Sequence, residues 1–339
     1  MKNNIKLLDC TLRDGGYIVN WVFGDDVIKK TAQMLTDANI DIIECGYLNN
    51  ADYVEGKSIF KHIEQIGEFI PKDRKNALYL AMADVLQYKP EDITDYTGNS
   101  IDGIRVVFYK HQVEEAMLLS KRIVEAGYKL FVQPMVTIDY TKQEYADLIA
   151  RIAKLKPQGV AIVDSFGYML KEDFRYYFSI LDTFLDDDVW IGFHSHNNMQ
   201  LAFITAQDVC DYETNRTLVI DSSLYGMGRG AGNLNTELFA NYFNMVSHYK
   251  YNIEVIMDAI SEFIMPIAKD HIWGYSPYLY LTALYHCHPN FACYLLEKHE
   301  ITVSQFRDFI QLIPTEMKTK CRKPYVEELY VKFCEKYGK

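Results

Sequence analysis

The sequence has no cysteine pair of the C-x-x-C kind and no apolar run long enough to cross a membrane. Its seven cysteines are odd in number and scattered over 339 residues, a pattern that suits reduced thiols in a protein core. A transmembrane helix needs roughly 18 to 20 apolar residues, which no segment supplies, and the N-terminus lacks the apolar region of a signal peptide. We therefore predict a cytoplasmic protein with no targeting segment and no membrane contact.

Positive charge is also scarce. The chain carries 35 Lys and Arg against 46 Asp and Glu, a formal net charge of -11 at pH 7. Nucleic-acid binding draws most of its affinity from Lys and Arg that neutralise phosphates, so this balance argues against a nucleic-acid partner. A small anionic substrate stays compatible with it, because a metal ion or one buried arginine can create a local positive field.

Eight short apolar segments recur along the first 221 residues, separated by segments with helical spacing of apolar residues. Continuous apolar runs are typical of parallel strands buried on both faces, and their alternation with helices indicates right-handed βαβ units. A doubly wound open sheet is the alternative, but no G-x-G-x-x-G motif follows the first run. We predict an α/β fold, a (β/α)₈ TIM barrel. The predicted strands lie near residues 5–10, 40–45, 77–82, 101–107, 128–135, 158–163, 189–194 and 217–221.

The pattern changes after about residue 250. Helical spacing continues without a further strand-like run, and five prolines divide the segment into short helices. Aromatic residues are dense between Trp273 and Tyr294, which indicates helix packing or a homodimer surface rather than a cofactor site. We predict a catalytic barrel over residues 1–250 and a helical C-terminal extension over residues 251–339.

Two polar segments follow predicted strands, at the face where TIM barrels build their active sites. Arg13 and Asp14 after the first strand offer a cation and a hard oxygen ligand, although a surface ion pair is an equal interpretation. His194 and His196 end the seventh strand, and their i, i+2 spacing places both imidazoles on one face. Together the segments predict a divalent-metal site with positions open for a substrate.

A glycine-rich loop from Gly226 to Asn233 follows the eighth predicted strand. Its four glycines permit positive φ and close approach of the backbone to another group. The loop is a candidate phosphate cradle, as in other barrels, or a packing loop. Asn233 at its end is a candidate fourth metal ligand or a helix cap.

The segments DCTLRDGGY, IIECGYL, FHSHNN and GMGRGAGN, in this order, resemble the metal-dependent lyase superfamily of hydroxymethylglutaryl-CoA lyase, isopropylmalate synthase and 4-hydroxy-2-oxovalerate aldolase. The resemblance is closest to the aldolases and covers about residues 5–245. It implies a barrel that binds Mn²⁺ or Mg²⁺, with Co²⁺ or Zn²⁺ also compatible with the ligands. It also implies cleavage or formation of a carbon-carbon bond next to a 2-oxo acid, such as the conversion of a 4-hydroxy-2-oxo acid to pyruvate and an aldehyde.

The family motifs assign roles to particular residues. Asp14, His194 and His196 match the metal ligands, and Asn233 matches an asparagine that binds the metal in some members. Arg13 matches the arginine that stabilises the enolate oxygen.

Two further positions match the aldolases more loosely. Ser165, after the sixth predicted strand, matches a serine near the substrate, and Tyr275 resembles an aldolase tyrosine. Glu44, at the end of the second predicted strand, is a candidate support for the metal ligands or a structural ion-pair partner of Arg105.

The sequence departs from the aldolase pattern at the expected base. The aldolases have a histidine three residues after the metal aspartate, where this chain has Tyr17. A phenol is a poor base at neutral pH. Tyr17 is therefore activated by its surroundings, or His111 or Tyr275 takes its place, or the reaction differs.

The alternatives to an aldolase are a Claisen-type acyltransferase of the isopropylmalate synthase kind and a metal-binding barrel that acts as a non-catalytic scaffold subunit. The two glycines after Asp14 disfavour the acyltransferase. The resemblance implies a small 2-oxo acid as substrate and an acylating aldehyde dehydrogenase as a candidate partner.

Overall fold

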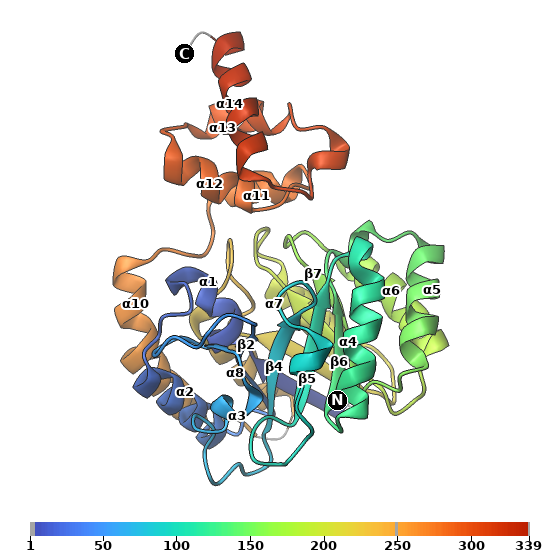
Figure 1. Cartoon of the computed structure of the whole chain (residues 1–339). Helices are drawn as coiled ribbons and strands as arrows, with labels where there is room; N and C mark the ends of the chain where they lie inside the picture. The colour runs from blue at the N-terminus through green and yellow to red at the C-terminus, as the bar shows by residue number, and fades with distance from the viewer. Residues whose placement is uncertain (1–3, 248–249, 338–339) are drawn as a thin grey trace.

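Eight parallel strands close into a barrel in the computed structural model, which describes residues 4–247 and 250–337 (Figure 1). The first strand pairs with both the second and the last, which closes the sheet. A two-residue strand, β3 (Ile59–Phe60), pairs with the C-terminal end of β2. The barrel strands are β1 (Asn4–Asp9), β2 (Ile42–Leu48), β4 (Leu78–Asp84), β5 (Gly103–Phe108), β6 (Lys129–Pro134), β7 (Gly159–Asp164), β8 (Trp190–Ser195) and β9 (Thr217–Ser222).

The predicted (β/α)₈ barrel is thus confirmed, and each strand begins and ends within three residues of its predicted range. Helices surround the strands because each presents one apolar stripe to the sheet, as Ile28, Thr31 and Leu35 of α2 do. The surrounding helices are α2 (Asp25–Asp37), α3 (Ile63–Ile66), α4 (Val113–Glu125), α5 (Lys142–Ala153), α6 (Lys171–Phe184), α7 (Ala202–Cys210) and α8 (Thr236–Val246), and α1 (Gly16–Val19) lies near the mouth.

The chain after residue 250 is helical and packs in two parts. Ile256, Ala259 and Phe263 belong to the same hydrophobic core as the barrel helices. The later helices bury a second core, in which Phe291, Phe306 and Phe309 are fully enclosed. We propose that the barrel unit extends through α10, so that the division lies near residue 271 rather than at 250. The helices are α9 (Ile253–Ala259), a π-helical turn (Ile260–Ile264), α10 (Met265–Asp270), α11 (Pro277–Leu284), α12 (Asn290–Lys298), α13 (Val303–Ile310) and α14 (Lys323–Tyr337).

The second helical unit, α11–α14, stands over the C-terminal ends of the barrel strands (Figure 1). The side-chain amide of Asn198 donates to the carbonyl of Leu279 at 3.3 Å, and Ala231 of the glycine-rich loop packs into the core of that unit. The unit therefore covers the mouth of the barrel, where active sites of this fold lie.

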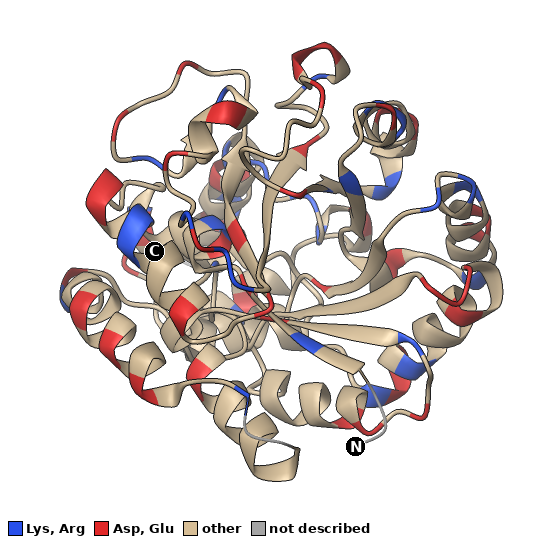
Figure 2. Cartoon of the chain, turned by 90° about the horizontal axis from the view of Figure 1, so that it is seen from below, with Lys and Arg blue, Asp and Glu red and all other residues tan. Residues whose placement is uncertain are grey.

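Acidic and basic residues are interspersed along the surrounding helices (Figure 2). Within residues 4–247 and 250–337, no helix has the length and apolar character needed to cross a bilayer.

Asp9, at the end of β1, makes stability depend on pH. Burial raises the pKa of Asp9 from 3.8 to about 6, although Thr236 and Thr11 hydrogen-bond its carboxylate and oppose the shift. The folded protein therefore binds this proton more tightly than the unfolded chain does. The stabilisation that Asp9 protonation gives to the folded state is complete below pH 3.8 and is lost as the pH rises to about 6.

We expect the free energy of unfolding, relative to Asp9→Asn, to fall by on the order of 3 kcal/mol between about pH 4 and pH 7. Urea unfolding of both proteins at several pH values measures this difference. Parallel pH profiles for the two proteins would rule out the assignment to Asp9.

Candidate metal centre

Three buried side chains converge at the C-terminal ends of the barrel strands. Asp14 follows β1, His194 lies in β8 and His196 comes just after β8. One ligand atom from each lies within 4.8 Å of the other two. The structure therefore brings together the two segments that the sequence predicted to share a metal ion, and a mixed oxygen and nitrogen set without thiolates suits a hard or borderline divalent cation.

A π-helical turn, Thr11–Gly15, carries Asp14 into the site. The carbonyl of Cys10 accepts hydrogen bonds from the backbone N–H groups of Arg13 and Asp14, at 3.1 and 2.7 Å. Glycine is required at residue 16, because a Cβ there would lie 2.0 Å from the ring of Trp21. Trp21 in turn donates its indole N–H to the carbonyl of Arg13 at 2.8 Å, which fixes the turn.

Each histidine has its Nδ1 atom engaged by another group. His194 Nδ1 lies 3.0 Å from Asp221 Oδ2, and His196 Nδ1 lies 3.3 Å from the carbonyl of Gly232. Such contacts fix the orientation of a ligating imidazole and leave its Nε2 atom free for a metal. Both imidazole rings are therefore oriented to coordinate a metal ion through Nε2.

The protonation states also suit metal binding. Burial, only partly offset by Asp14, lowers the pKa of His196 to about 3, so this imidazole is neutral at pH 7. Burial alone would raise the pKa of Asp14, but Arg13 and His196 outweigh it, and the pKa lies well below its usual range. A neutral imidazole and an ionised carboxylate are the forms that bind metals.

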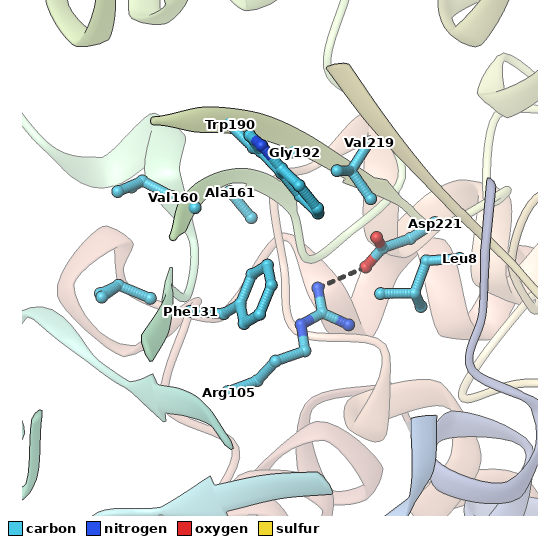
Figure 3. Close-up of a pocket in the computed structure, with 11 residues that line it drawn as sticks. Leu8, Arg105, Phe131, Val160, Ala161, Trp190, Gly192, Val219 and Asp221 are labelled. Carbon is cyan, nitrogen blue, oxygen red and sulfur yellow. Dashed lines mark hydrogen bonds and ion pairs between the residues drawn. The ribbon is translucent and has the colours of Figure 1, made fainter. Parts of the chain in front are cut away.

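A buried chain of charges links Asp14 to His194. Arg13 contacts Asp14 and also donates from Nε to Glu44 at 2.7 Å. Arg105 joins Glu44, at 3.2 Å, to Asp221, at 2.6 Å. The predicted Glu44–Arg105 pair is thus confirmed, and Glu44 also supports Arg13. A small cavity lined by apolar side chains lies beside the Arg105–Asp221 pair (Figure 3), so apolar groups shield the pair on that side.

Asn233 lies beside Asp14 and donates its side-chain N–H to Asp14 Oδ2 at 2.8 Å. Its Oδ1 atom is buried without a hydrogen-bond partner. Asn233 does not cap α8, whose N-cap is Asn235. A Cβ at Gly228 would lie 2.6 Å from Asp14 Oδ2, so glycine there lets the loop reach this carboxylate. The loop therefore packs on an anion at this point, which argues against a phosphate cradle there.

One guanidinium nitrogen of Arg13 has no hydrogen-bond partner among the described residues. The Arg13 side chain is 4% exposed, and while Nε and Nη1 serve Glu44 and Asp14, Nη2 is buried without a partner. An unsatisfied buried donor is costly, so a ligand oxygen at this place would be stabilised.

An inner pocket of about 320 Å³ is lined by three of the candidate ligands, Asp14, His194 and His196, and by the sequence candidates Arg13, Tyr17 and Ser165. The Tyr17 hydroxyl lies 3.2 Å from that of Tyr47. Ser165 Oγ accepts the backbone N–H of Val136 at 2.8 Å. The structure therefore gathers these three sequence candidates at one place.

Two candidates lie outside the inner pocket. Tyr275 is 60% exposed and lines a wider cleft between the barrel mouth and α11–α14. His111 is exposed and stacks beside Tyr109. Neither lines the inner pocket, so Tyr17 is the candidate base that does.

Sequence reasoning missed three polar residues of the site. Gln133, at the end of β6, lines the inner pocket with a buried, unpartnered Oε1 atom. Asp221 positions His194, and Arg229 of the glycine-rich loop lines the same pocket. A polar residue at the C-terminal end of an apolar strand was the available signal for Gln133 and Asp221.

Asp221→Asn tests the support of His194. Asn has about the same size but no charge, and it leaves Glu44 as the partner of Arg105. We expect Mn²⁺ affinity to fall roughly 10- to 100-fold, because an outer-shell carboxylate no longer orients the imidazole. Titration with Mn²⁺ measures the change, and the exposed Asp52→Asn serves as the matched control. Unchanged affinity in Asp221→Asn would show that the contact has no part in metal binding.

The comparisons with known proteins agree with this geometry. The sequence model of the HMGL-like family matches residues 4–263. An oxaloacetate decarboxylase from Mycobacterium tuberculosis is 27% identical over 278 residues, covering 81% of this chain and 78% of that protein. A 4-hydroxy-2-oxovalerate aldolase from Rhodococcus jostii is 25% identical over 252 residues, covering 73% and 70%. The N-terminal domain of a proposed aldolase from Bacteroides vulgatus superposes with a TM-score of 0.75 at 25% identity, over 86% of this chain and 97% of that one.

Proposed function

The chain belongs to the HMGL-like family and is a lyase, and we propose that it cleaves 4-hydroxy-2-oxo acids to pyruvate and an aldehyde with one divalent ion, Mn²⁺ or Mg²⁺. One observation carries the proposal: the buried donors of Asp14, His194 and His196 share a pocket with the free Nη2 of Arg13. Asn233 is the proposed fourth ligand through its unpartnered Oδ1.

Metal and arginine together supply what this cleavage needs. A divalent ion bound by these residues would polarise the 2-oxo group of the substrate. Arg13 then donates from Nη2 to the oxygen on which negative charge grows as the C3–C4 bond breaks. Glu44 and Asp14 hold the guanidinium on two sides, so the donor needs no reorientation during the reaction.

Tyr17 is the proposed base for the 4-hydroxyl proton. It is the sequence candidate at the histidine position and lines the inner pocket. Burial, together with neighbouring Tyr17, raises the pKa of Tyr47, so Tyr47 keeps its proton and can donate a hydrogen bond to the Tyr17 oxygen. That hydrogen bond would stabilise the negatively charged oxygen of deprotonated Tyr17.

Decarboxylation of a 2-oxo diacid is the second candidate reaction. Among the described residues that line the inner pocket, the acidic and imidazole groups are Asp14, His194 and His196, all three proposed metal ligands. Loss of carbon dioxide removes no hydroxyl proton and therefore needs no base at that position. The relative from Mycobacterium tuberculosis is named an oxaloacetate decarboxylase.

Tyr17→Phe separates the two reactions. Pyruvate release from 4-hydroxy-2-oxo acids, with Mn²⁺ and without coenzyme A, is expected to fall roughly 100-fold or more in this variant, because a general base is lost. Release from oxaloacetate should not change, after subtraction of the rate with metal alone. If the wild-type protein releases pyruvate from oxaloacetate only, decarboxylation is its reaction; release from neither substrate would refute both.

We also propose the oligomeric state, partner and location that the sequence analysis predicted. A homodimer, an aldehyde dehydrogenase partner and a cytoplasmic location fit a lyase that acts on small 2-oxo acids. The scaffold alternative has lost its support, since the family membership and its named relatives indicate an enzyme.

A further inference from the structure

We propose that Arg229 binds a second anionic group, a carboxylate or phosphate, on the part of the substrate that leaves as the aldehyde. The substrates would then be 2-oxo acids with two negatively charged ends. This inference rests on the proposed lyase function, because it names the substrate class of the same site.

Arg229 lies where the inner pocket meets the outer cleft, and both it and Tyr17 line the two spaces. Its backbone nitrogen is 3.3 Å from Asp14 Oδ2. Its side chain passes over the Tyr17 ring, with the guanidinium carbon 5.6 Å from the ring centre, and Nη2 is 3.4 Å from the carbonyl of Ser165. The phenol of Tyr109 is a hydrogen-bond partner of this side chain, and burial raises the pKa of Tyr109, so this partner carries no charge at pH 7. A substrate bound beside Asp14 and extending toward the outer cleft would therefore pass next to this guanidinium.

The Arg229 guanidinium hydrogen-bonds only to neutral groups, the Ser165 carbonyl and the Tyr109 phenol, among the described residues, whereas the other arginines of the site pair with carboxylates. Arg13 and Arg105 each form ion pairs with two carboxylates. In residues 4–247 and 250–337, no carboxylate forms an ion pair with the side chain of Arg229, and its Nε atom is buried without a hydrogen-bond partner. A half-buried cation whose hydrogen-bond partners are all neutral is stabilised by an anion that accepts its N–H groups.

The cleft around Arg229 suits such an anion. Among its described lining residues none is acidic, although the chain carries a net charge of -11. Tyr275, Ser276 and Asn290 line the cleft with polar groups. His288 also lines it, but burial lowers the pKa of His288, so Arg229 supplies the positive charge. A site that concentrates one sign of charge attracts the opposite sign.

The chemistry of guanidinium defines the ligand class. A carboxylate or phosphate can accept two parallel N–H bonds from an arginine, which a hydroxyl or an aldehyde oxygen cannot do. Arg229 would thus be a specificity residue that distinguishes dianionic from monoanionic 2-oxo acids.

Two unreactive five-carbon acids test the inference by binding. 2-Oxoglutarate and 2-oxovalerate share one 2-oxo acid skeleton and differ in a terminal carboxylate. Titration calorimetry with Mn²⁺-loaded protein should show 2-oxoglutarate binding roughly 10- to 100-fold more tightly. In Arg229→Gln the ratio of the two dissociation constants should approach one, whereas Arg229→Lys should keep part of the preference. 2-Oxo-4-phosphonobutyrate, as a third ligand, shows whether phosphonate or carboxylate fits better.

Arg151→Gln is the matched control, since it removes the same charge from a pair with Glu114 on the surface. It should keep the wild-type ratio. Equal affinity of the wild-type protein for 2-oxoglutarate and 2-oxovalerate, or a preference that Arg229→Gln retains, would overturn the inference. These titrations need no turnover, so a failure of pyruvate release would refute the proposed function without deciding the role of Arg229.

Discussion

Asp14→Asn is expected to abolish pyruvate formation and to weaken Mn²⁺ binding by more than the roughly 10- to 100-fold that loss of an outer-shell partner causes. Asp14 supplies the anionic ligand, and its carboxylate is held ionised by Arg13 and His196. An amide of the same shape keeps the volume but loses the charge. Manganese titration, followed by the signal of the free ion, measures the affinity, and a coupled assay measures pyruvate.

The fold should tolerate this substitution. The Asn233 amide now donates to Asp14 Oδ2, while its Oδ1 atom is buried without a partner. Rotation of the Asn233 amide by half a turn would let its oxygen accept a hydrogen bond from the amide that Asp14→Asn introduces. This contact offsets part of the loss of the buried Arg13–Asp14 ion pair, so we expect the variant to unfold cooperatively, at a temperature below that of wild type. Mn²⁺ affinity equal to that of wild type would contradict the assignment of Asp14 as a ligand.

Arg13→Lys is expected to lower kcat roughly 100- to 1000-fold with a smaller effect on KM. The guanidinium can serve Glu44 and Asp14 and still point a third nitrogen, Nη2, at the substrate oxygen. A lysine ammonium is a compact point charge without this planar geometry. Steady-state kinetics on a 4-hydroxy-2-oxo acid measures the loss.

Arg105→Lys is the matched control within the same buried network. Arg105 pairs with Glu44 and Asp221, one residue further from the proposed substrate. We expect both variants to lose stability, but kcat to fall much more in Arg13→Lys. An equal fall of kcat in the two variants would mean that Arg13 acts through the network alone.

The barrel could be predicted from the sequence because its strands are buried on both faces. Segments such as residues 159–164 and 217–222 read as apolar runs, and the regular alternation with helices leaves few topologies. The division after the barrel was harder to place. Helical spacing continues without a break past residue 250, and only the three-dimensional packing shows that Ile256 and Phe263 join the barrel core.

The candidate ligands could be predicted because Asp14 and the His194–His196 pair sit at strand ends with a spacing that fixes their direction. The role of Arg229 could not be predicted from the sequence. An arginine in a glycine-rich loop gives no sign of whether a carboxylate pairs with it, since the partner depends on segments far away in sequence. Tyr275 shows the converse: its match to the aldolases gave no indication that it lies in the outer cleft.

Pyruvate release from a 4-hydroxy-2-oxo acid, by protein stripped with a chelator and then titrated with Mn²⁺, tests the metal centre most directly. We expect no release from the stripped protein and a rate that saturates at one ion per chain, with no recovery in Asp14→Asn. Pyruvate release that persists after chelation, or that Asp14→Asn retains, would refute a catalytic metal held by Asp14, His194 and His196.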